Sequence, residues 1–188
     1  MLMQDGGNML SAPDQNETVE FGADLSSVLS PSLRAFADVW QKSRTGDGFP
    51  SRQDLNPAEF PRLLPHLYIM DRDQPPVHWR YRLAGAEIHQ SLQQVSLKGR
   101  GLNEVLPENA LPLVSRRWSP VADAGSGVYM SGPIYRDADS FRVGARLLLP
   151  LSDSRDRTTT GLVGVSMQDR QSQRISGEEP LRIAHIDL

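Results

Sequence analysis

The sequence contains no cysteine, and this absence excludes several kinds of chemistry at once. Without a thiol the chain has no disulfide, no thiolate metal site, no catalytic thiol and no cysteinyl-flavin photochemistry. Long apolar runs are also missing. No stretch approaches the roughly 18 residues that a membrane span needs, and no basic-then-apolar signal segment opens the chain. We therefore expect a cytoplasmic protein with no membrane partner.

A strong net charge of either sign is lacking too. Twenty Lys and Arg residues stand against 23 Asp and Glu residues, which gives a formal net charge of −3. So small a charge supplies no general attraction to nucleic acid, and we expect no nucleic-acid partner. The charges are unevenly placed, because residues 1–30 contain acids and no Lys or Arg. The acids in this segment are Asp5, Asp14, Glu17, Glu20 and Asp24.

Residues 1–29 mix Gly, Asn, Ser and acids without periodicity, which predicts a disordered acidic tail. Order is expected from residue 30, where a Ser-Pro pair is typical of a helix start, and residues 30–58 form a helical extension. Leu33, Phe36 and Trp40 fall at helical spacing and predict one apolar stripe. They are candidate interface residues, because the stripe covers either its own sheet or that of a second copy. A homodimer through this helix is therefore an expectation.

Strand patterns dominate residues 59–168, which we take as the main domain, followed by a C-terminal tail at 169–188. Two strands come first, then several short helices, then three strands. This order predicts an α+β fold with one five-stranded antiparallel sheet and helices on one face. The expected strands are 63–70, 79–83, 128–135, 141–151 and 158–167.

Signatures of enzymes are scarce. The sequence has no Gly-x-Gly-x-x-Gly, no Walker loop and no Gly-x-Ser-x-Gly. A small isomerase or hydrolase in a cone-shaped α+β fold is one alternative, with Glu87 or His89 as the nearest acid or base. A second alternative is a ligand-free scaffold that binds other proteins. Haem and other metals are disfavoured because the helix expected from Asn109 to Ala124 has no histidine.

Several short motifs occur in a characteristic order. They are Pro-Ser-Arg-x-Asp at 50–54, Leu-Leu-Pro at 63–65, Arg-Tyr-Arg-Leu-Ala-Gly at 80–85, Gly-Arg at 99–100 and Leu-Pro-Leu at 149–151. Together with the tryptophan-bearing helix, they resemble a stand-alone PAS-domain family of proteobacteria over residues 31–168. The resemblance implies a sensory or regulatory domain with no catalytic output of its own. It also implies a partner such as a signalling histidine kinase.

A domain of this kind usually holds a small molecule between its sheet and helices. Aromatic side chains from the second strand and the long helix would line the cavity, although plain core packing explains the same pattern. An arginine after a glycine could bind an anion, or pair with Glu104 one helical turn on. No cofactor is indicated by the sequence. The candidate ligand-binding residues are Trp79, Tyr81, Trp118, His89 and Arg100.

Overall fold

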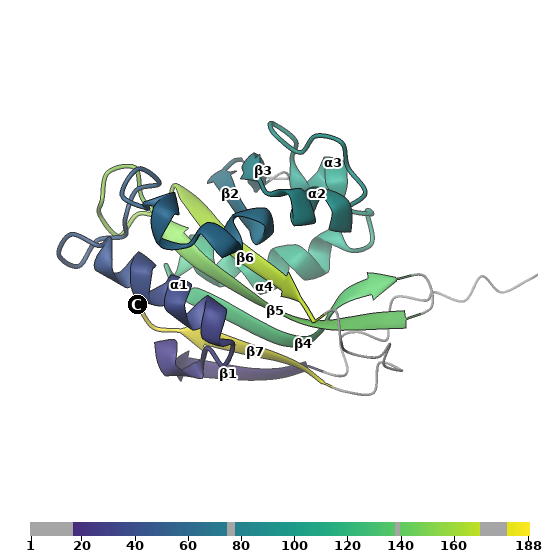
Figure 1. The fold of residues 1–188 in the computed structure, drawn as a ribbon, viewed down its shortest axis with the longest axis horizontal. Helices are drawn as coiled ribbons and strands as arrows, with labels where there is room; N and C mark the ends of the chain where they lie inside the picture. The colour runs from purple at the N-terminus through teal and green to yellow at the C-terminus, as the bar shows by residue number, and fades with distance from the viewer. Residues whose placement is uncertain (1–16, 75–77, 138–139, 170–179) are drawn as a thin grey trace, which may run out of the picture.

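The computed structural model describes residues 17–74, 78–137, 140–169 and 180–188, and these form one mixed sheet with helices on both faces (Figure 1). The strands are β1 (Glu17–Ala23), β2 (Leu67–Arg72), β3 (Trp79–Ala84), β4 (Gly127–Asp137), β5 (Ser140–Leu151), β6 (Gly161–Gln168) and β7 (Leu181–Ile186). The α-helices are α1 (Pro31–Lys42), α2 (Ala86–Ser91), α3 (Leu102–Val105) and α4 (Leu111–Asp123). Short 3₁₀ turns are η2 (Leu25–Ser27), η3 (Pro57–Glu59) and η4 (Pro61–His66).

The sheet has the strand order β1-β7-β4-β5-β6-β2-β3. All neighbours are antiparallel except β1 and β7, which run parallel. The α+β class is confirmed, but the expected five antiparallel strands are corrected to a mixed sheet of seven. The additional strands are β1 and β7, from segments expected to be tails. Residues 1–16 and 170–179, also placed in those tails, lie outside the described residues.

Helices cover both faces of the sheet, not one as expected. Helix α1 packs on one face, in a core cluster that includes Leu147, Leu149 and Val163. Helices α2, α3 and α4 pack on the opposite face, in a cluster that includes Leu148 and Leu162. Figure 1 shows α1 and α4 on opposite sides of the strands. The central strands therefore bury successive residues on alternate faces.

The stripe predicted on α1 is present and faces the chain's own sheet. Ser30 precedes the helix, and Pro31 occupies its first position, where a missing N–H costs nothing. Leu33, Phe36 and Trp40 are 0% exposed in the single chain. The indole Nε1 of Trp40 donates a 3.0 Å hydrogen bond to the Pro150 carbonyl at the end of β5. The stripe of the expected dimer interface is thus already covered within one chain.

The segment after α1 is fastened to the loop between β5 and β6. Phe49 N donates to the Asp156 carbonyl at 2.8 Å, and Ser152 N donates to the Pro50 carbonyl at 3.0 Å. Gly48 permits this approach, because a Cβ at that position would lie 1.9 Å from the Arg155 carbonyl oxygen. The Pro-Ser-Arg-x-Asp motif at 50–54 therefore joins α1 to the sheet.

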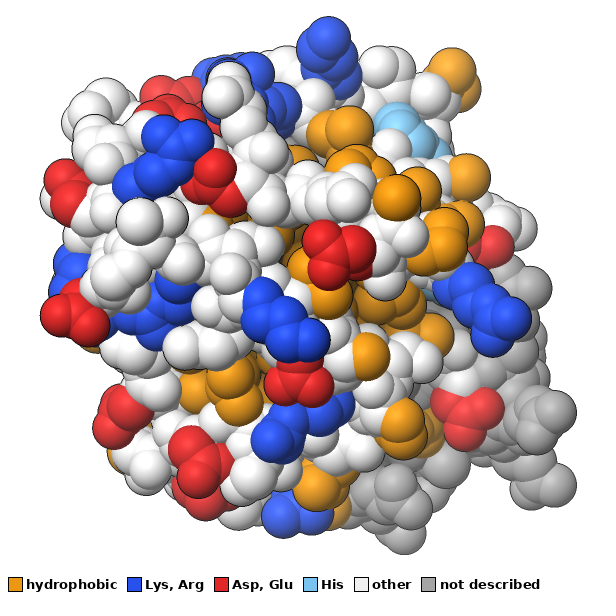
Figure 2. Space-filling view, turned by 60° about the vertical axis from the view of Figure 1, so that its left-hand side comes forward, with side chains coloured by type: hydrophobic (Ala, Val, Ile, Leu, Met, Phe, Trp, Pro, Cys, Tyr) orange, Lys and Arg blue, Asp and Glu red, His pale blue; other side chains and the backbone are white. Residues whose placement is uncertain are grey.

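An ion pair completes this junction. Arg155 donates from Nε and Nη2 to the two oxygens of Asp54, each at 2.9 Å. Ser51 N adds a third hydrogen bond to Asp54 at 2.8 Å. Arg155 has φ of 57°, a conformation that costs energy in a residue with a Cβ, and the two-pronged pair holds it there. Figure 2 shows Lys and Arg side chains beside Asp and Glu side chains at several places on one face of the molecule.

A buried carboxylate fixes β1 to α4. The Glu17 side chain is 9% exposed and accepts hydrogen bonds from Arg117, whose side chain is 17% exposed. Arg116 contacts the other Glu17 oxygen at 3.2 Å. Glu17 thus belongs to an ion cluster, not to an acidic tail. The residues that follow Glu17 in β1 are exposed, so the hydrophobic pattern of the sequence does not indicate that Glu17 forms a buried ion pair.

We expect Glu17→Gln to lower the free energy of unfolding by about 2 kcal/mol, because it leaves a partly buried arginine without its counter-charge. Glu20→Gln, on the same strand but exposed, should change it by no more than about 0.5 kcal/mol. Urea unfolding of both variants measures the difference. Equal stabilities would show that the cluster contributes nothing to holding β1.

Stability should also depend on Asp54 at acid pH. Hydrogen bonds from Arg155 are the main cause that lowers the Asp54 pKa from 3.8 to about 2. A carboxylate with a depressed pKa in the folded chain stabilises it above pH 3.8, and this contribution is lost as the pH falls through about 2. Asp54→Asn should therefore flatten the dependence of stability on pH in that window. Since the Arg155 side chain is 46% exposed, water weakens the pair and the loss at pH 7 should be about 1 kcal/mol or less.

The measurement is the urea midpoint as a function of pH. Asp38→Asn serves as the control, because that side chain is 56% exposed and lies on the surface of α1. An identical pH slope for Asp54→Asn and the wild-type chain would contradict the role given to the pair.

Candidate functional site

Aromatic rings gather between the sheet and α4. Tyr68 of β2 stacks on Trp118 of α4, with ring centroids 6.0 Å apart and planes 21° apart. Tyr81 of β3 approaches Tyr68 with centroids 6.2 Å apart. Tyr68, Tyr81 and Trp118 are each no more than 5% exposed. These three rings, here called the aromatic cluster, join two strands to the helix above them.

A glycine makes room for the central ring of the aromatic cluster. Gly164 of β6 is the direct cross-strand partner of Tyr68. A Cβ on Gly164 would lie 2.2 Å from the Tyr68 Cζ and 2.6 Å from its hydroxyl oxygen. The Tyr68 ring therefore packs directly on the backbone of β6. Only glycine at position 164 allows the ring to approach the backbone this closely.

Two of the sequence-predicted ligand residues face this interior, as the alternation along β3 indicates. Trp79 and Tyr81 are 2% and 5% exposed, and both belong to the cluster beneath α4. The alternation in the sequence predicts Leu83 on the same face as Trp79 and Tyr81, but Leu83 is 48% exposed. The register of β3 against β2 shifts between the partners of Ile69 and Met70, which places a β-bulge at Arg82. One additional residue reverses the facing of everything after it.

A charged group that the candidate ligand residues do not include lies in this region. The Arg146 guanidinium lies 5.8 Å from the centre of the Trp118 ring, and its Nε donates to the Ser166 hydroxyl at 2.6 Å. Ser166 is 3% exposed and sits on β6. In the sequence Arg146 alternates with Leu147 and Leu149, and this alternation by itself predicts that Arg146 lies on the outer face of the sheet. That face is covered by α4, so Arg146 is half-buried beside the aromatic cluster.

Helix α4 is fixed at its C-terminal end as well as by Glu17. Arg72 at the end of β2 donates to the Ala122 carbonyl at 2.9 Å and pairs with Asp123 at 3.1 Å. The Thr159 hydroxyl donates to the Val121 carbonyl at 3.0 Å. A positive charge at the end of a helix also complements the helix dipole. Helix α4, which covers the aromatic cluster, is therefore attached to β1, to β2 and to the loop before β6.

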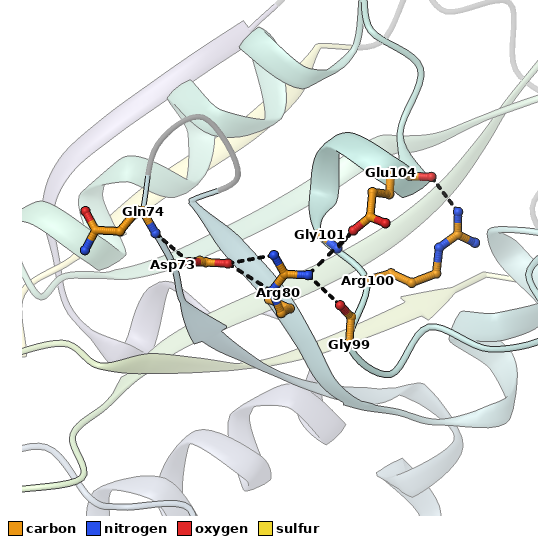
Figure 3. A network of polar contacts seen from close by, with 7 residues as sticks. All are labelled: Asp73, Gln74, Arg80, Gly99, Arg100, Gly101 and Glu104. Atoms are coloured by element: carbon orange, nitrogen blue, oxygen red, sulfur yellow. Dashed lines mark hydrogen bonds and ion pairs between the residues drawn. The ribbon is translucent and has the colours of Figure 1, made fainter.

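Arg100 lies away from the aromatic cluster, in a polar network beyond β3 (Figure 3). Its guanidinium donates to the Gln94 side chain and, at 2.7 Å, to the Glu104 carbonyl. The Glu104 carboxylate accepts instead from Gly101 N at 2.6 Å and lies 3.6 Å from Arg80.

Arg80 is the centre of the same network. It pairs with Asp73 at 2.9 Å and donates to the Gly99 carbonyl at 2.6 Å. The backbone amide of Gln74 and the Arg80 guanidinium together hold the Asp73 pKa below its usual value of 3.8. These contacts fasten the loop around Gly99 along the outer edge of β3. Arg100 and its neighbours thus cover a sheet edge in this structure.

The acid and base considered for an enzyme lie on α2. Ile88 is the buried residue of that helix, and Glu87 and His89 flank it at half-buried positions outside the aromatic cluster. The Nδ1 atom of His89 is buried and has no hydrogen-bond partner in the part of the chain that the structure describes. Ile88, between these two side chains, packs in the same core cluster as Trp79, Tyr81 and Trp118.

A hollow lies beside η2, on the face of the sheet opposite to the one that α4 covers. It has a volume of about 280 Å³. The sequence pattern did not indicate it, since two of the three strands that line it, β1 and β7, were not expected. Its lining residues are Thr18, Glu20, Ser26, Ser27, Leu29, Tyr129, Ser131, Arg182, Ile183 and Ala184.

Within the described ranges, no three His, Asp or Glu side chains gather in a group suited to a metal ion. Over the same ranges, every helix is too short or too polar to cross a bilayer.

Comparison with known proteins identifies the fold family. A family model described as "PAS domain" matches residues 28–167. Among solved structures, the Rhodobacter sphaeroides LOV protein is similar with a TM-score of 0.43 and 11% identity, over 74% of this chain and 69% of that one. VqmA bound to DPO is similar with a TM-score of 0.41 and 16% identity, over 56% of this chain and 53% of that one. A search of curated proteins found no match.

The contact between Tyr68 and Gly164 gives a direct test of the aromatic cluster. Gly164→Ala should destabilise the fold by about 1–3 kcal/mol, because the new methyl overlaps the Tyr68 ring. In the Tyr68→Leu background the same substitution should cost much less, since the ring is gone. A double-mutant cycle by urea unfolding measures this coupling. Additive effects would mean that some group other than the Tyr68 ring resists the new methyl.

Proposed function

Since this chain belongs to the PAS-domain family, we propose that it is a cytoplasmic sensory domain that binds a small ligand and passes the signal to a partner protein. The observation that carries this proposal is the aromatic cluster beneath α4, with Arg146 beside it. Trp79, Tyr81 and Trp118 supply apolar surface and polar tips, and the guanidinium supplies charge. A site of this composition suits a small molecule with a ring and an acidic group.

Ligand entry requires the rings to move, because they are almost fully buried as they stand. Trp118 is on α4, so a molecule that separates it from Tyr68 displaces the helix. The helix is tied to β1 through Glu17 and to β2 through Arg72. Such a displacement shifts the equilibrium between two arrangements of the strands at the edge of the sheet. The difference in ligand affinity between these two arrangements provides the free energy for the signal.

The proposal includes no catalytic step in this chain. Glu87 and His89 of α2 are assigned no acid–base role in it. Family membership supports an output through another protein, for which a signalling histidine kinase is the candidate. A homodimer remains part of the proposal, but its interface must use side chains other than the buried stripe of α1.

The test is mass spectrometry of the freshly purified chain, first native and then denatured. We expect a small molecule that is released on denaturation from the wild-type chain and absent from Trp118→Ala. Trp40→Phe is the matched control, because Trp40 is buried against the other face of the sheet and should leave ligand retention unchanged. Arg146→Gln is the second variant, and it should weaken retention without removing the indole.

Three results would contradict the proposal. One is a wild-type chain that carries no small molecule and shows no thermal shift with any of a panel of aromatic acids. Another is full retention by both Trp118→Ala and Arg146→Gln. The third is loss of the molecule in Trp40→Phe alone, which would put the site on the opposite face.

A further inference from the structure

Two opposite charges line the hollow beside η2. Glu20 projects from β1 and Arg182 from β7, and both side chains are exposed. They share one face of the sheet as diagonal neighbours, since Thr18 is the partner of Arg182 and Glu20 is the partner of Ala184. No ion pair joins them, and neither has a charged partner within residues 17–74, 78–137, 140–169 and 180–188. The hollow therefore presents both signs of charge with a gap between them.

The side chain at the bottom of the hollow is small, and hydroxyl groups surround it. Ala184 stands between Glu20 and Tyr129 in one cross-strand row, and its methyl group leaves the row hollow at the centre. The next row holds Thr18 and Ser131 on either side of Arg182. The hydroxyls of these residues and of Ser26 and Ser27 can donate or accept hydrogen bonds.

The wall opposite the strands is held in place. Asp24 accepts a 2.6 Å hydrogen bond from Ser26 N at the start of η2. Hydrogen bonds from the Ser26 side chain and from its backbone amide lower the pKa of the Asp24 carboxyl. Arg34 of α1 donates to the Leu25 carbonyl. Val28 is 3% exposed and anchors the segment in the core. The hollow is thus bounded by a fixed turn and by three hydrogen-bonded strands.

We propose that this hollow binds a small zwitterion, a free α-amino acid, with its carboxylate on Arg182 and its ammonium group on Glu20. Arginine matches a carboxylate through two parallel donors, and a carboxylate accepts well from an ammonium group. The volume of about 280 Å³ falls just below the roughly 300–1,000 Å³ of pockets for drug-sized ligands, which suits a smaller molecule. Leu29, 63% exposed at the rim, offers apolar contact to the side chain.

This site is independent of the aromatic cluster. Tyr129 and Ala184 belong to the core cluster on the α1 side of the sheet, whereas Trp118 belongs to the cluster on the α4 side. Most of its lining lies outside residues 28–167, the part that matches the family. Amino-acid binding here is therefore a property of the additional strands. It can be tested independently of the ligand proposed beneath α4.

The test uses the full chain and the twenty common amino acids, each titrated separately with backbone amide NMR. We expect at least one to give saturable shifts on β1, β7 and η2. Its N-acetyl and carboxamide derivatives, which each lack one charge, should bind at least about tenfold more weakly. Arg182→Gln and Glu20→Gln should weaken the parent amino acid by a similar factor. Arg62→Gln and Glu108→Gln are the matched controls, since both side chains are exposed and lie outside the hollow.

Trp118→Ala separates this proposal from the previous one, because it should leave the amino-acid affinity unchanged. Absence of saturable shifts with all twenty amino acids would overturn the assignment. So would equal binding of the parent and its N-acetyl derivative, or an affinity that Arg182→Gln and Glu20→Gln do not alter. Binding that is lost in Trp118→Ala and kept in Arg182→Gln would place the amino acid beneath α4.

Discussion

The architecture depends on a sheet whose central strands are apolar on both faces. Leu147, Leu148 and Leu149 follow one another along β5, point to alternate faces, and are each 0% exposed. Leu162 and Val163 on β6 do the same. A strand of this kind cannot leave one side in water, so the fold needs a helical layer on each side. Helix α1 supplies one layer and α4 with its neighbours the other.

This constraint also explains what the sequence could and could not predict. The stripe on α1, the alternation of Trp79 and Tyr81, and the strands β2 to β6 follow from local periodicity, which depends on neighbours in the chain. The run of three leucines on β5 indicates burial on both faces of the sheet. The alternation of Arg142, Gly144 and Arg146 with apolar residues indicates instead that only one face is buried. Arg146 was consequently placed outside. Once both faces are recognised as covered, the same alternation puts it under α4.

Other features depend on contacts that no local pattern records. Strand β1 is polar and mostly exposed, and its strong anchors among the described residues are β7 and two arginines of α4, all distant in the sequence. The bulge that turns Leu83 outward arises from pairing with β2, not from β3 itself. Arg100 was a reasonable anion ligand by residue type, yet its position beside the edge of β3 gives it backbone and amide partners. In each case the missing information is the identity of the neighbour across space.

The place of β7 in the sheet has a consequence for the order in which the protein is made. Strand β7 lies between β1 and β4, although β1 is synthesised first and β7 last among the described strands. On the ribosome, strands β2 to β6 and α1 can assemble as soon as β6 has emerged, but β1 has no hydrogen-bonding partner among the described strands until β7 arrives. The exposed Val19 and Phe21 of β1 therefore have no strand beside them until the last described strand has been made. Final closure of the sheet is a late, long-range event, and its rate is governed by loop closure and not by local helix formation.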